Sequence, residues 1–397
     1  MRPVAWYRWT AELPSAWPRS SRPATRWRYA RSCGTWSRAL RSRTPTSWSP
    51  LPFLGATWIA SYGAPGFSFV PARIGWRRSG WTPPSLRRCC GTRGGGGSLA
   101  ATLMSFRLKR AVLASATAVW SGAARAAGLC ASGRPDLWHS PGGQRVLVVA
   151  PHPDDEIACA GTLLLHRRAG DVLHVAHATD GCAARAGGLT RGEMHDRRRE
   201  EARVAADLLG VAGAHWLGLR EGDWEEAALV PALRDLVRQT APHVLYAPSR
   251  VDFHPEHVRV ARGLAAALSG DGALGCTIRV YEVQVPLTPV LVNFVTPIGA
   301  VVDELIGAME CYPTQLGSIE RLLRMKRYAA SFYGLSQLAE EFWQMDPAAY
   351  RRAHAARAAP EADGAFRGVR ARPFTDPLSY LRGLGARRQL RDVSQGP

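Results

Sequence analysis

From residue 145 onward, short apolar runs alternate along the chain with longer segments whose apolar residues recur at helical spacing. The first run, 145–150 (RVLVVA), is apolar after its first residue and predicts a strand that is buried on both faces. The pattern predicts further strands at 172–178, 214–219 and 243–247. It predicts helices between the strands at 156–169, 192–210 and 226–240. Repeated strand–helix units build a mostly parallel sheet with helices on both faces. We therefore expect an α/β, doubly wound protein with a Rossmann-like three-layer sandwich.

The pattern is less regular after residue 277. Two strands are expected at 278–285 and 290–295, and two helices at 298–309 and 318–341. The tail, 346–397, is rich in Ala, Arg and Pro, and we expect it to be poorly ordered. The folded domain is accordingly predicted to span 141–345.

The charge of the chain is unevenly distributed. Residues 1–100 hold sixteen Arg, no Lys and one acid, Glu12, and so carry +15 of the formal net charge of +19. The same stretch holds nine of the fourteen Trp and shows almost no helical or strand periodicity. We expect residues 1–103 to be a low-complexity region that is disordered or that follows a start codon assigned too early, with Met104 the better start. No folded basic patch is evident, which argues against nucleic acid as a partner.

Residues 104–140 are predicted to be a lead-in to the domain. Basic residues, an Ala-rich stretch at 111–120 and then Ala124-Arg125-Ala126 weakly resemble a secretory signal; an amphipathic helix or disordered segment is the alternative. The eight Cys lack the spacing of a thiolate zinc site or an evident disulfide framework, which favours a cytoplasmic protein, with export as the alternative if 104–126 is a signal peptide. No uninterrupted apolar run is long enough to span a bilayer.

Polar residues gather directly after the first predicted strand. The loop reads Pro151-His152-Pro153-Asp154-Asp155-Glu156. Open α/β sheets bind ligands beyond the carboxyl ends of their strands, and an imidazole with three carboxylates there is costly to bury unless it pairs or binds something. The alternative to a ligand site is that the three carboxylates are ordinary acidic residues at a helix N-terminus.

A second cluster follows the strand at 243–247 and reads Asp252-Phe253-His254-Pro255-Glu256-His257. In a parallel sheet the two loops share one edge. Two His from one loop, and one His with two Asp from the other, match the ligand set of a hydrolytic zinc centre with an open water position. A divalent cation there would acidify a water molecule, and Asp154 is the natural general base.

The string His-Pro-Asp-Asp-Glu after the first strand and His-Pro-Glu-His about 100 residues later resemble the LmbE-like (PIG-L) N-acetylglucosaminyl deacetylase family. The resemblance extends over roughly 145–340. It implies the LmbE-like deacetylase fold and a zinc-dependent hydrolase, with one Zn²⁺ per chain, that removes acetyl from an N-acetylamino sugar or its conjugate. Iron or cobalt is an alternative metal.

The resemblance also implies roles for individual residues. It makes His152, Asp155 and His257 the metal ligands, Asp154 the general base and His254, as an imidazolium, the group that steadies the oxyanion. Arg198 falls at the family's sugar-binding arginine, although a solvated arginine on a charged helix is equally compatible with the sequence. Glu256 replaces the family's more frequent Asp and is expected to orient His254. The remaining histidines considered are weaker candidates: His166, His174, His177, His195, His215 and His243.

Three other functions stay open. The same site could serve a metal-dependent amidase acting on a larger sugar or thiol-sugar conjugate. A non-catalytic sugar-binding protein on this scaffold is less compatible with the sequence, because Asp154 and His254 are not needed to hold a metal. A nucleic-acid or membrane-surface binder would rest on residues 1–100 alone. The expected partner is therefore a small-molecule acetylamino sugar, and the sequence leaves the oligomeric state open.

Overall fold

The computed structural model describes residues 99–129, 134–183, 188–269, 275–355, 365–366 and 380–396. The chain divides into two compact units, Met1–Thr10 with Ser115–Pro397, and Ala11–Ala114. Predictions for residues 1–98 lie outside the described residues. Helix α2 (Leu99–Leu129) occupies most of the expected lead-in. None of the helices in the described part of the chain has the length and apolarity that a bilayer span requires.

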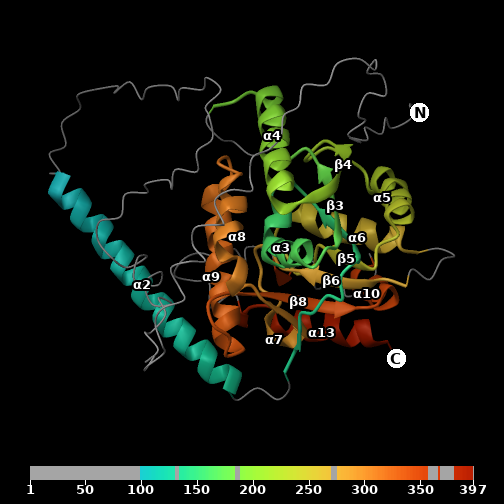
Figure 1. The fold of residues 1–397 in the computed structure, drawn as a ribbon. Coiled ribbons are helices and arrows are strands. Elements are labelled where there is room, and N and C mark those ends of the chain that lie inside the picture. The colour runs from blue at the N-terminus through green and yellow to red at the C-terminus, as the bar shows by residue number, and fades with distance from the viewer. Residues whose placement is uncertain are drawn as a thin grey trace, which may run out of the picture. The chain divides into compact units, whose positions relative to one another are not determined.

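The described part of the larger unit is built on one eight-stranded sheet (Figure 1). Its strands are β1 (Asp136–Leu137), β2 (Arg145–Ala150), β3 (Val172–Thr179), β4 (Val211–Leu219), β5 (Val244–Ala247), β6 (Thr277–Tyr281), β7 (Phe294–Pro297) and β8 (Ala339–Met345). The order across the sheet is β1-β7-β8-β6-β5-β2-β3-β4. Only β8 runs antiparallel to its neighbours, β6 and β7. The prediction of a mostly parallel α/β sheet is confirmed.

Helices cover both faces of this sheet. They are η1 (Asp155–Cys159), α3 (Ala160–Arg168), α4 (Arg191–Leu209), α5 (Glu226–Thr240), α6 (Pro255–Ala267), α7 (Thr288–Leu291), η2 (Gly299–Val301), α8 (Val302–Glu310), α9 (Leu316–Phe332), α10 (Pro347–His354) and α13 (Leu384–Gln395). Alternate residues of β2 enter different cores, as the two-residue period of a strand requires. Leu147 and Val149 pack with residues of α5 and α6. Val146 and Val148 pack with residues of α3, α4 and α8.

Local sequence signals set where two of these helices begin and end. Thr190 accepts a hydrogen bond from the backbone N–H of Glu193 and completes a capping box at the start of α4. The same helix ends at Gly210, which adopts the left-handed conformation (φ 72°) expected for this position. Helix α6 begins with His254 as its N-cap and Pro255 in its first turn, so the second polar cluster lies at a helix start.

The strand order reverses direction beside β2. The chain proceeds from β2 outward to β3 and β4, and then returns through α5 to β5 on the other side of β2. Ligands of open α/β sheets bind where the order reverses in this way, beyond the carboxyl ends of the strands. The loops that follow β2 and β5 therefore meet at one edge.

Two local predictions near the C-terminal end of the domain are wrong. The expected helix at 318–341 ends at Phe332, and residues from Ala339 onward form β8. The cause is a pair of buried charges: Glu340 and Glu341 resemble an exposed helix end in the sequence, yet both are buried in the sheet. The expected strand at 290–295 is instead the short helix α7 followed by β7, which begins at Phe294.

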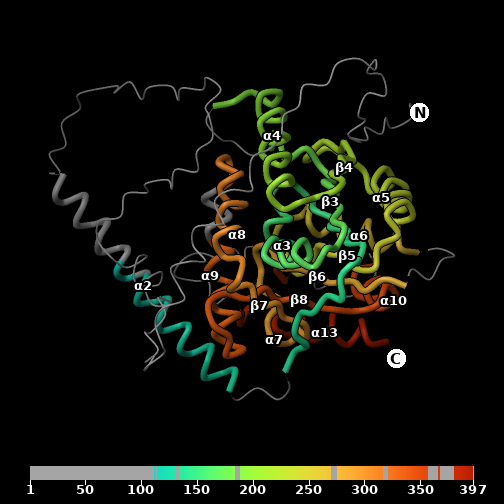
Figure 2. Tube along the Cα trace, in the orientation of Figure 1, coloured from blue at the N-terminus to red at the C-terminus, as the bar shows by residue number. Residues whose placement is uncertain are grey.

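The prediction that residues 346–397 are poorly ordered is wrong for two stretches. Helices α10 and α13 pack against each other at the end of the coloured trace (Figure 2). Tyr350 of α10 and Leu390 of α13 are fully buried in the core on the α5 and α6 side. Each helix has one apolar stripe that packs against the core, and the Ala- and Arg-rich composition of the tail did not reveal it.

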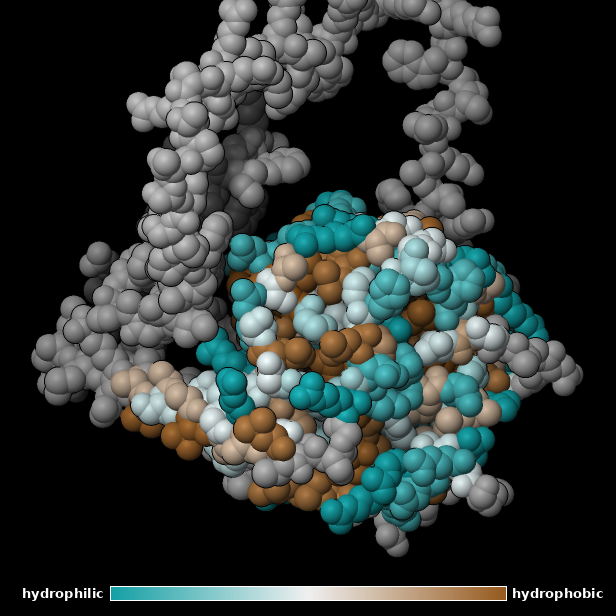
Figure 3. Space-filling model, turned by 60° about the horizontal axis from the view of Figure 1, so that its bottom comes forward, coloured by the Kyte–Doolittle hydropathy of each residue, from teal (hydrophilic) through white to brown (hydrophobic). Residues whose placement is uncertain are grey.

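Some apolar side chains of the described residues remain exposed, among them Leu137 and Leu381. The face drawn in Figure 3 shows brown hydrophobic residues interspersed with teal hydrophilic ones. This mixture is usual, because polar groups do not suffice to cover a folded surface.

We predict that Leu390→Ala destabilises the protein by about 2–5 kcal/mol, because it removes a fully buried side chain from a packed core. Urea unfolding followed by circular dichroism measures the change. Leu381→Ala, at a position that is 61% exposed, is the matched control and should change stability by less than about 0.5 kcal/mol. Equal effects of the two substitutions would show that α13 does not contribute to the core.

We further predict that stability falls with rising pH through a buried carboxyl pair. Glu282 and Glu341 hydrogen-bond to each other, and burial raises the pKa of Glu282 to about 7 and that of Glu341 well above its ordinary value. Because the pKa values are higher in the folded than in the unfolded protein, the protonated pair contributes its full stability below about pH 4, where an unfolded Glu is also protonated. This contribution is lost as the pH rises through the folded-state pKa values. Glu341→Gln should therefore gain at least about 1 kcal/mol relative to wild type between pH 5 and pH 8, measured by urea unfolding. A pH-independent difference would contradict this.

Candidate metal centre and active site

The first half of the site is the loop after β2. His152 is 7% exposed and Asp155 5% exposed, so both side chains are largely withdrawn from water. The Oδ2 atom of Asp155 accepts a hydrogen bond from the backbone N–H of His152 at 2.8 Å, and the Nδ1 atom of the same histidine lies 3.1 Å from that oxygen. The turn thus aims one nitrogen and one carboxylate oxygen at a common point.

The second half comes from the first turn of α6. The Nε2 atom of His257 lies 3.1 Å from Nδ1 of His152 and 3.2 Å from Oδ2 of Asp155. The three atoms form a nearly equilateral triangle. Tetrahedral zinc with bonds of about 2.0–2.1 Å separates its ligand atoms by about 3.3–3.4 Å, so this triangle is close to the size that zinc requires. The donor set of two nitrogens and one oxygen also suits zinc.

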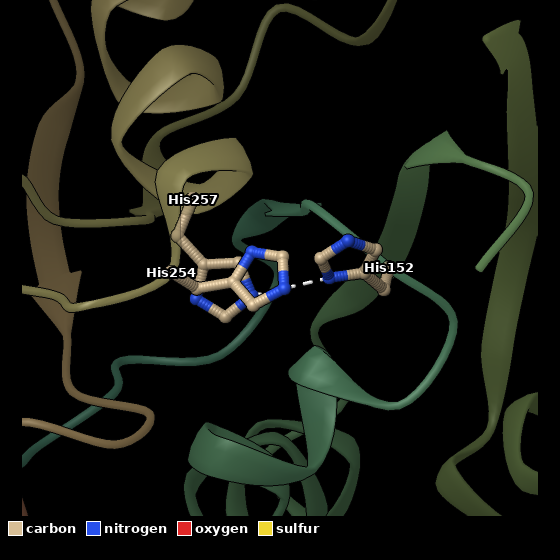
Figure 4. Close-up of side chains that lie close together, drawn as sticks. All are labelled: His152, His254 and His257. Atoms are coloured by element: carbon tan, nitrogen blue, oxygen red, sulfur yellow. Dashed lines mark hydrogen bonds between the residues drawn. The ribbon is translucent and has the colours of Figure 1, made fainter. Parts of the chain in front are cut away.

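A second grouping of donors includes His254. One nitrogen from each of His152, His254 and His257 lies within 4.8 Å of the others among the described residues. Figure 4 shows the three rings close together, with a dashed line for the contact between His152 and His257. We favour Asp155 over His254 as the third ligand, because its oxygen lies closer to the other two donor atoms and brings the negative charge that attracts a cation.

Carboxylates lie behind both histidines of the triangle. The Nδ1 atom of His257 lies 2.8 Å from Oδ2 of Asp252, and the Nε2 atom of His152 lies 3.0 Å from Oε2 of Glu256. A carboxylate can only accept a hydrogen bond, so each of these contacts favours a proton on the outer nitrogen. With a cation bound at the triangle, the inner nitrogens would supply the lone pairs. This is the usual arrangement behind metal-binding histidines.

The same carboxylates shift the pKa values of the two histidines. Burial lowers the pKa of His152, but hydrogen bonds to Asp155 and Glu256 more than offset this and raise it to about 9. Burial likewise opposes protonation of His257, and the charges of Asp155 and Asp252 hold its pKa well above the ordinary value. The site therefore has an excess of negative charge that favours a bound cation.

Asp154 is held in a strained conformation beside this triangle. Its φ is 134°, a region that residues with a side chain rarely adopt. Burial raises the pKa of its carboxyl group to about 6, against the opposing charge of Arg198. Strain of this kind persists only where surrounding contacts enforce it, and it is concentrated at functional sites.

Glu156 enforces the conformation of Asp154. It is 2% exposed, and its Oε2 atom accepts a hydrogen bond from the backbone N–H of Asp154 at 3.1 Å. Its other oxygen accepts a hydrogen bond from the hydroxyl of Tyr312, and Nε2 of His177 lies 3.4 Å from Oε2. Glu156 is therefore a structural support of the loop.

Arg198 lies against Asp154 from helix α4. It is 2% exposed, so the alternative that it is a solvated helix residue is wrong. Its Nη2 donates a hydrogen bond to Asp154 at 2.9 Å, whereas its buried Nε and Nη1 have no hydrogen-bond partner among the described residues. Gly181 allows this close packing: its φ is +64°, and a Cβ atom there would lie 2.9 Å from the guanidinium.

His254 lies on the open side of the triangle. Its ring centroid lies 4.9 Å from that of His152 and 4.8 Å from that of His257. Its Nδ1 accepts a hydrogen bond from the backbone N–H of Glu256 at 3.3 Å, which leaves the proton on Nε2. Burial and the charges of the two neighbouring histidines lower its pKa to about 4. These surroundings disfavour a second proton on the ring, which can donate a hydrogen bond from Nε2; the imidazolium that the resemblance implies stays a prediction.

The expected contact between the Glu256 carboxylate and the side chain of His254 is absent from the described hydrogen bonds. The carboxylate bonds instead to His152, to the backbone N–H of Gly222 at 2.6 Å and to Nε1 of Trp224 at 3.0 Å. The longer side chain of Glu allows it to reach past His254. Any orienting role of this carboxylate therefore concerns His152.

Sequence reasoning missed several supporting residues. They are Asp252, Tyr312, Trp224 and Glu221, whose Oε1 lies 3.5 Å from Nε2 of His152. Asp252 lies in the loop that carries the two histidines, and its position five residues before His257 was the available signal. Tyr312 follows α8 and reaches Glu156 only through folding, so no local pattern announces it. Among the weaker histidines, His166 bonds to Asp171 and Tyr246, and His243 accepts from the backbone of Arg145.

Comparison with known families gives one match. Residues 147–268 match the model of the PIG-L family, described as GlcNAc-PI de-N-acetylase. A curated relative, probable N-acetyl-alpha-D-glucosaminyl L-malate deacetylase 2 from Bacillus anthracis, is 29% identical over 136 residues. That alignment covers 32% of this chain and 60% of the relative, so the match extends over less than two thirds of the relative's length.

Two solved structures are similar to part of the chain. An N,N'-diacetylchitobiose deacetylase from Pyrococcus horikoshii is 20% identical with a TM-score of 0.45, and the match covers 51% of this chain and 84% of that one. A conserved protein from Thermus thermophilus is 26% identical with a TM-score of 0.45, covering 51% of this chain and 95% of that one.

We predict that Asp154→Gly is more stable than Asp154→Ala by about 1 kcal/mol, because glycine adopts a φ of 134° without strain. Both variants remove the same carboxylate and the same ion pair with Arg198, so their difference isolates the backbone conformation. Urea unfolding of the two variants side by side measures it. An alanine variant as stable as the glycine variant would show that position 154 carries no strain.

Proposed function

Since residues 147–268 form a PIG-L (LmbE-like) domain, we propose that this protein is a metal-dependent N-deacetylase that acts on an N-acetylamino sugar or its conjugate. The observation that carries the proposal is the triangle of His152, Asp155 and His257, with Asp154 and His254 beside it. Zinc is the proposed metal, one per chain, because the donor set has two imidazole nitrogens and one carboxylate oxygen.

A divalent cation held by His152, Asp155 and His257 would polarise the acetyl carbonyl and acidify a water molecule at neutral pH. Asp154 accepts the proton of that water as it attacks the carbonyl carbon. Its neighbour Arg198 favours the ionised carboxylate that this step needs, and burial keeps the carboxylate basic enough to take the proton.

His254 acts on the other side of the carbonyl. Its Nε2–H is free to donate a hydrogen bond to the oxyanion that develops there, because the backbone fixes its Nδ1 as an acceptor. As the C–N bond breaks, the proton held by Asp154 passes to the departing amine. The acetic acid that leaves the site gives up its proton to the amine, so the products are acetate and the amino sugar as its ammonium ion, and atoms and charge balance.

Arg198 gives the proposed site its polar substrate contact. Two of its buried nitrogen atoms have no hydrogen-bond partner in the described structure, and an unmet buried donor is unfavourable by about 1–3 kcal/mol. A sugar hydroxyl next to the acetamido group would satisfy them. This feature favours a hydroxyl-rich substrate over a simple apolar amide.

We predict that the zinc-loaded protein releases acetate from N-acetylglucosamine, its malate conjugate or N,N'-diacetylchitobiose, and that a chelator abolishes the release. Asp154→Asn should lower kcat by about 10²–10⁴-fold, the usual contribution of a general base, with its zinc content unchanged. Acetate release and zinc content are measured together on each protein.

His195→Gln is the matched control, because the side chain of His195 on α4 is 41% exposed and bonds only to Asp196 in the described structure. It should retain full activity. A zinc-loaded, folded protein that releases no acetate from any of the three sugars would favour the amidase alternative, tested with longer acyl chains. A wild-type protein that takes up no divalent metal would rule out both hydrolases.

A further inference from the structure

Glu256 connects three parts of the site. It is the second residue of α6 and is 5% exposed. Its Oε2 lies 3.0 Å from Nε2 of His152. Its Oε1 accepts hydrogen bonds from the backbone N–H of Gly222 at 2.6 Å and from Nε1 of Trp224 at 3.0 Å. Both oxygens are therefore engaged, Oε2 with His152 and Oε1 with two donors of the turn after β4.

The contact at Oε2 determines which nitrogen of His152 can bind a metal. A neutral imidazole carries one proton, and only the other nitrogen has a lone pair. The nitrogen that faces Asp155 and His257 is Nδ1, so His152 can bind a metal there only when its proton lies on Nε2. A carboxylate facing Nε2 accepts that proton's hydrogen bond and disfavours the opposite tautomer.

The contacts at Oε1 hold the turn 220–224, which follows β4. Gly222 adopts a φ of +82° in this turn, and Trp224 is 7% exposed within the core. The guanidinium of Arg259, one turn further along α6, lies 3.9 Å from the centre of the Trp224 ring. The start of α6 thus holds the turn by Glu256 and Arg259 together.

A second carboxylate also approaches His152. Oε1 of Glu221 lies 3.5 Å from the same Nε2 atom. Its backbone N–H donates to Asp180 at 3.1 Å, so the turn places this side chain at the site. The longer distance makes Glu221 the weaker acceptor.

We propose that Glu256 is a positioning residue that fixes the tautomer of His152 as a metal ligand. The proposal rests on the proposed function, since it concerns the same metal. In this proposal the carboxylate of Glu256 acts on His152, and not on His254 of the same His-Pro-Glu-His string.

Glu256→Gln is the informative substitution. If the amide oxygen keeps the hydrogen bonds from Gly222 and Trp224, the amide N–H group faces His152 and favours the tautomer that cannot use Nδ1 as a ligand. If the amide is reversed, an N–H group faces two donors of the turn. We expect zinc affinity to fall by about 10–100-fold, as is usual for the partners of ligand histidines. Competition of the full-length protein with a chromophoric chelator measures it.

Two variants separate the tautomer from its alternatives. Trp224→Phe removes one hydrogen bond to Oε1 and leaves His152 with its partner, so zinc affinity should stay within about twofold of wild type. Glu221→Gln should also change it by less than about threefold. A loss of affinity in either variant as large as that in Glu256→Gln would overturn the assignment to Glu256.

Wild-type zinc binding is measured first. A wild-type protein without zinc would refute the proposed function, whereas wild-type binding that Glu256→Gln leaves unchanged would refute this inference alone. If Glu256→Gln does not unfold cooperatively, Glu256→Asp replaces it, because its carboxylate is withdrawn by about 1.5 Å and keeps its charge. Wild-type affinity in a folded Glu256→Asp would likewise overturn the proposal.

Discussion

The pairing of β2 with β5 is the constraint on which the site depends. The two strands are separated by almost a hundred residues, yet Val146 lies beside Val244 and Val148 beside Tyr246 in parallel register. Parallel register places the carboxyl ends of both strands at one edge, so each delivers its loop to the same point. A shift of two residues would displace one loop by about 7 Å, more than twice the separation of the ligand atoms.

Sequence periodicity predicted the elements that build this edge. The apolar run 145–150 can only be read as a buried strand, and the helical spacing of 226–240 only as a helix. The two His-containing loops were located from the predicted ends of the strands that precede them. The same reasoning failed for β8, because Glu340 and Glu341 are acidic residues buried inside a sheet. Glu340 pairs with Lys326 and bonds to Thr162, so its burial depends on partners far away in the chain.

Some of the side chains at the site could likewise be predicted from the sequence, and others could not. His152, Asp155 and His257 lie in short strings that can be recognised locally, and the structure brings them within 3.2 Å of one another. Glu256 was recognised too, but not its partner, since the direction of a side chain across the site depends on the turn 220–224. No local sequence pattern points to Tyr312 or Trp224. Residues that define a site are local in the sequence, whereas those that hold it are distributed.

The first turn of α6 also limits how the chain can change in length. His254 caps the helix and His257 follows three residues later, so one helical turn sets the separation of their rings. One inserted residue between them would rotate His257 by about 100° around the helix axis, away from His152. The segments 152–155 and 252–257 are therefore fixed in residue number, while the chain between β2 and β5 only has to return to the correct edge. Insertions and deletions among related sequences should be concentrated in the connections and absent from these two short segments.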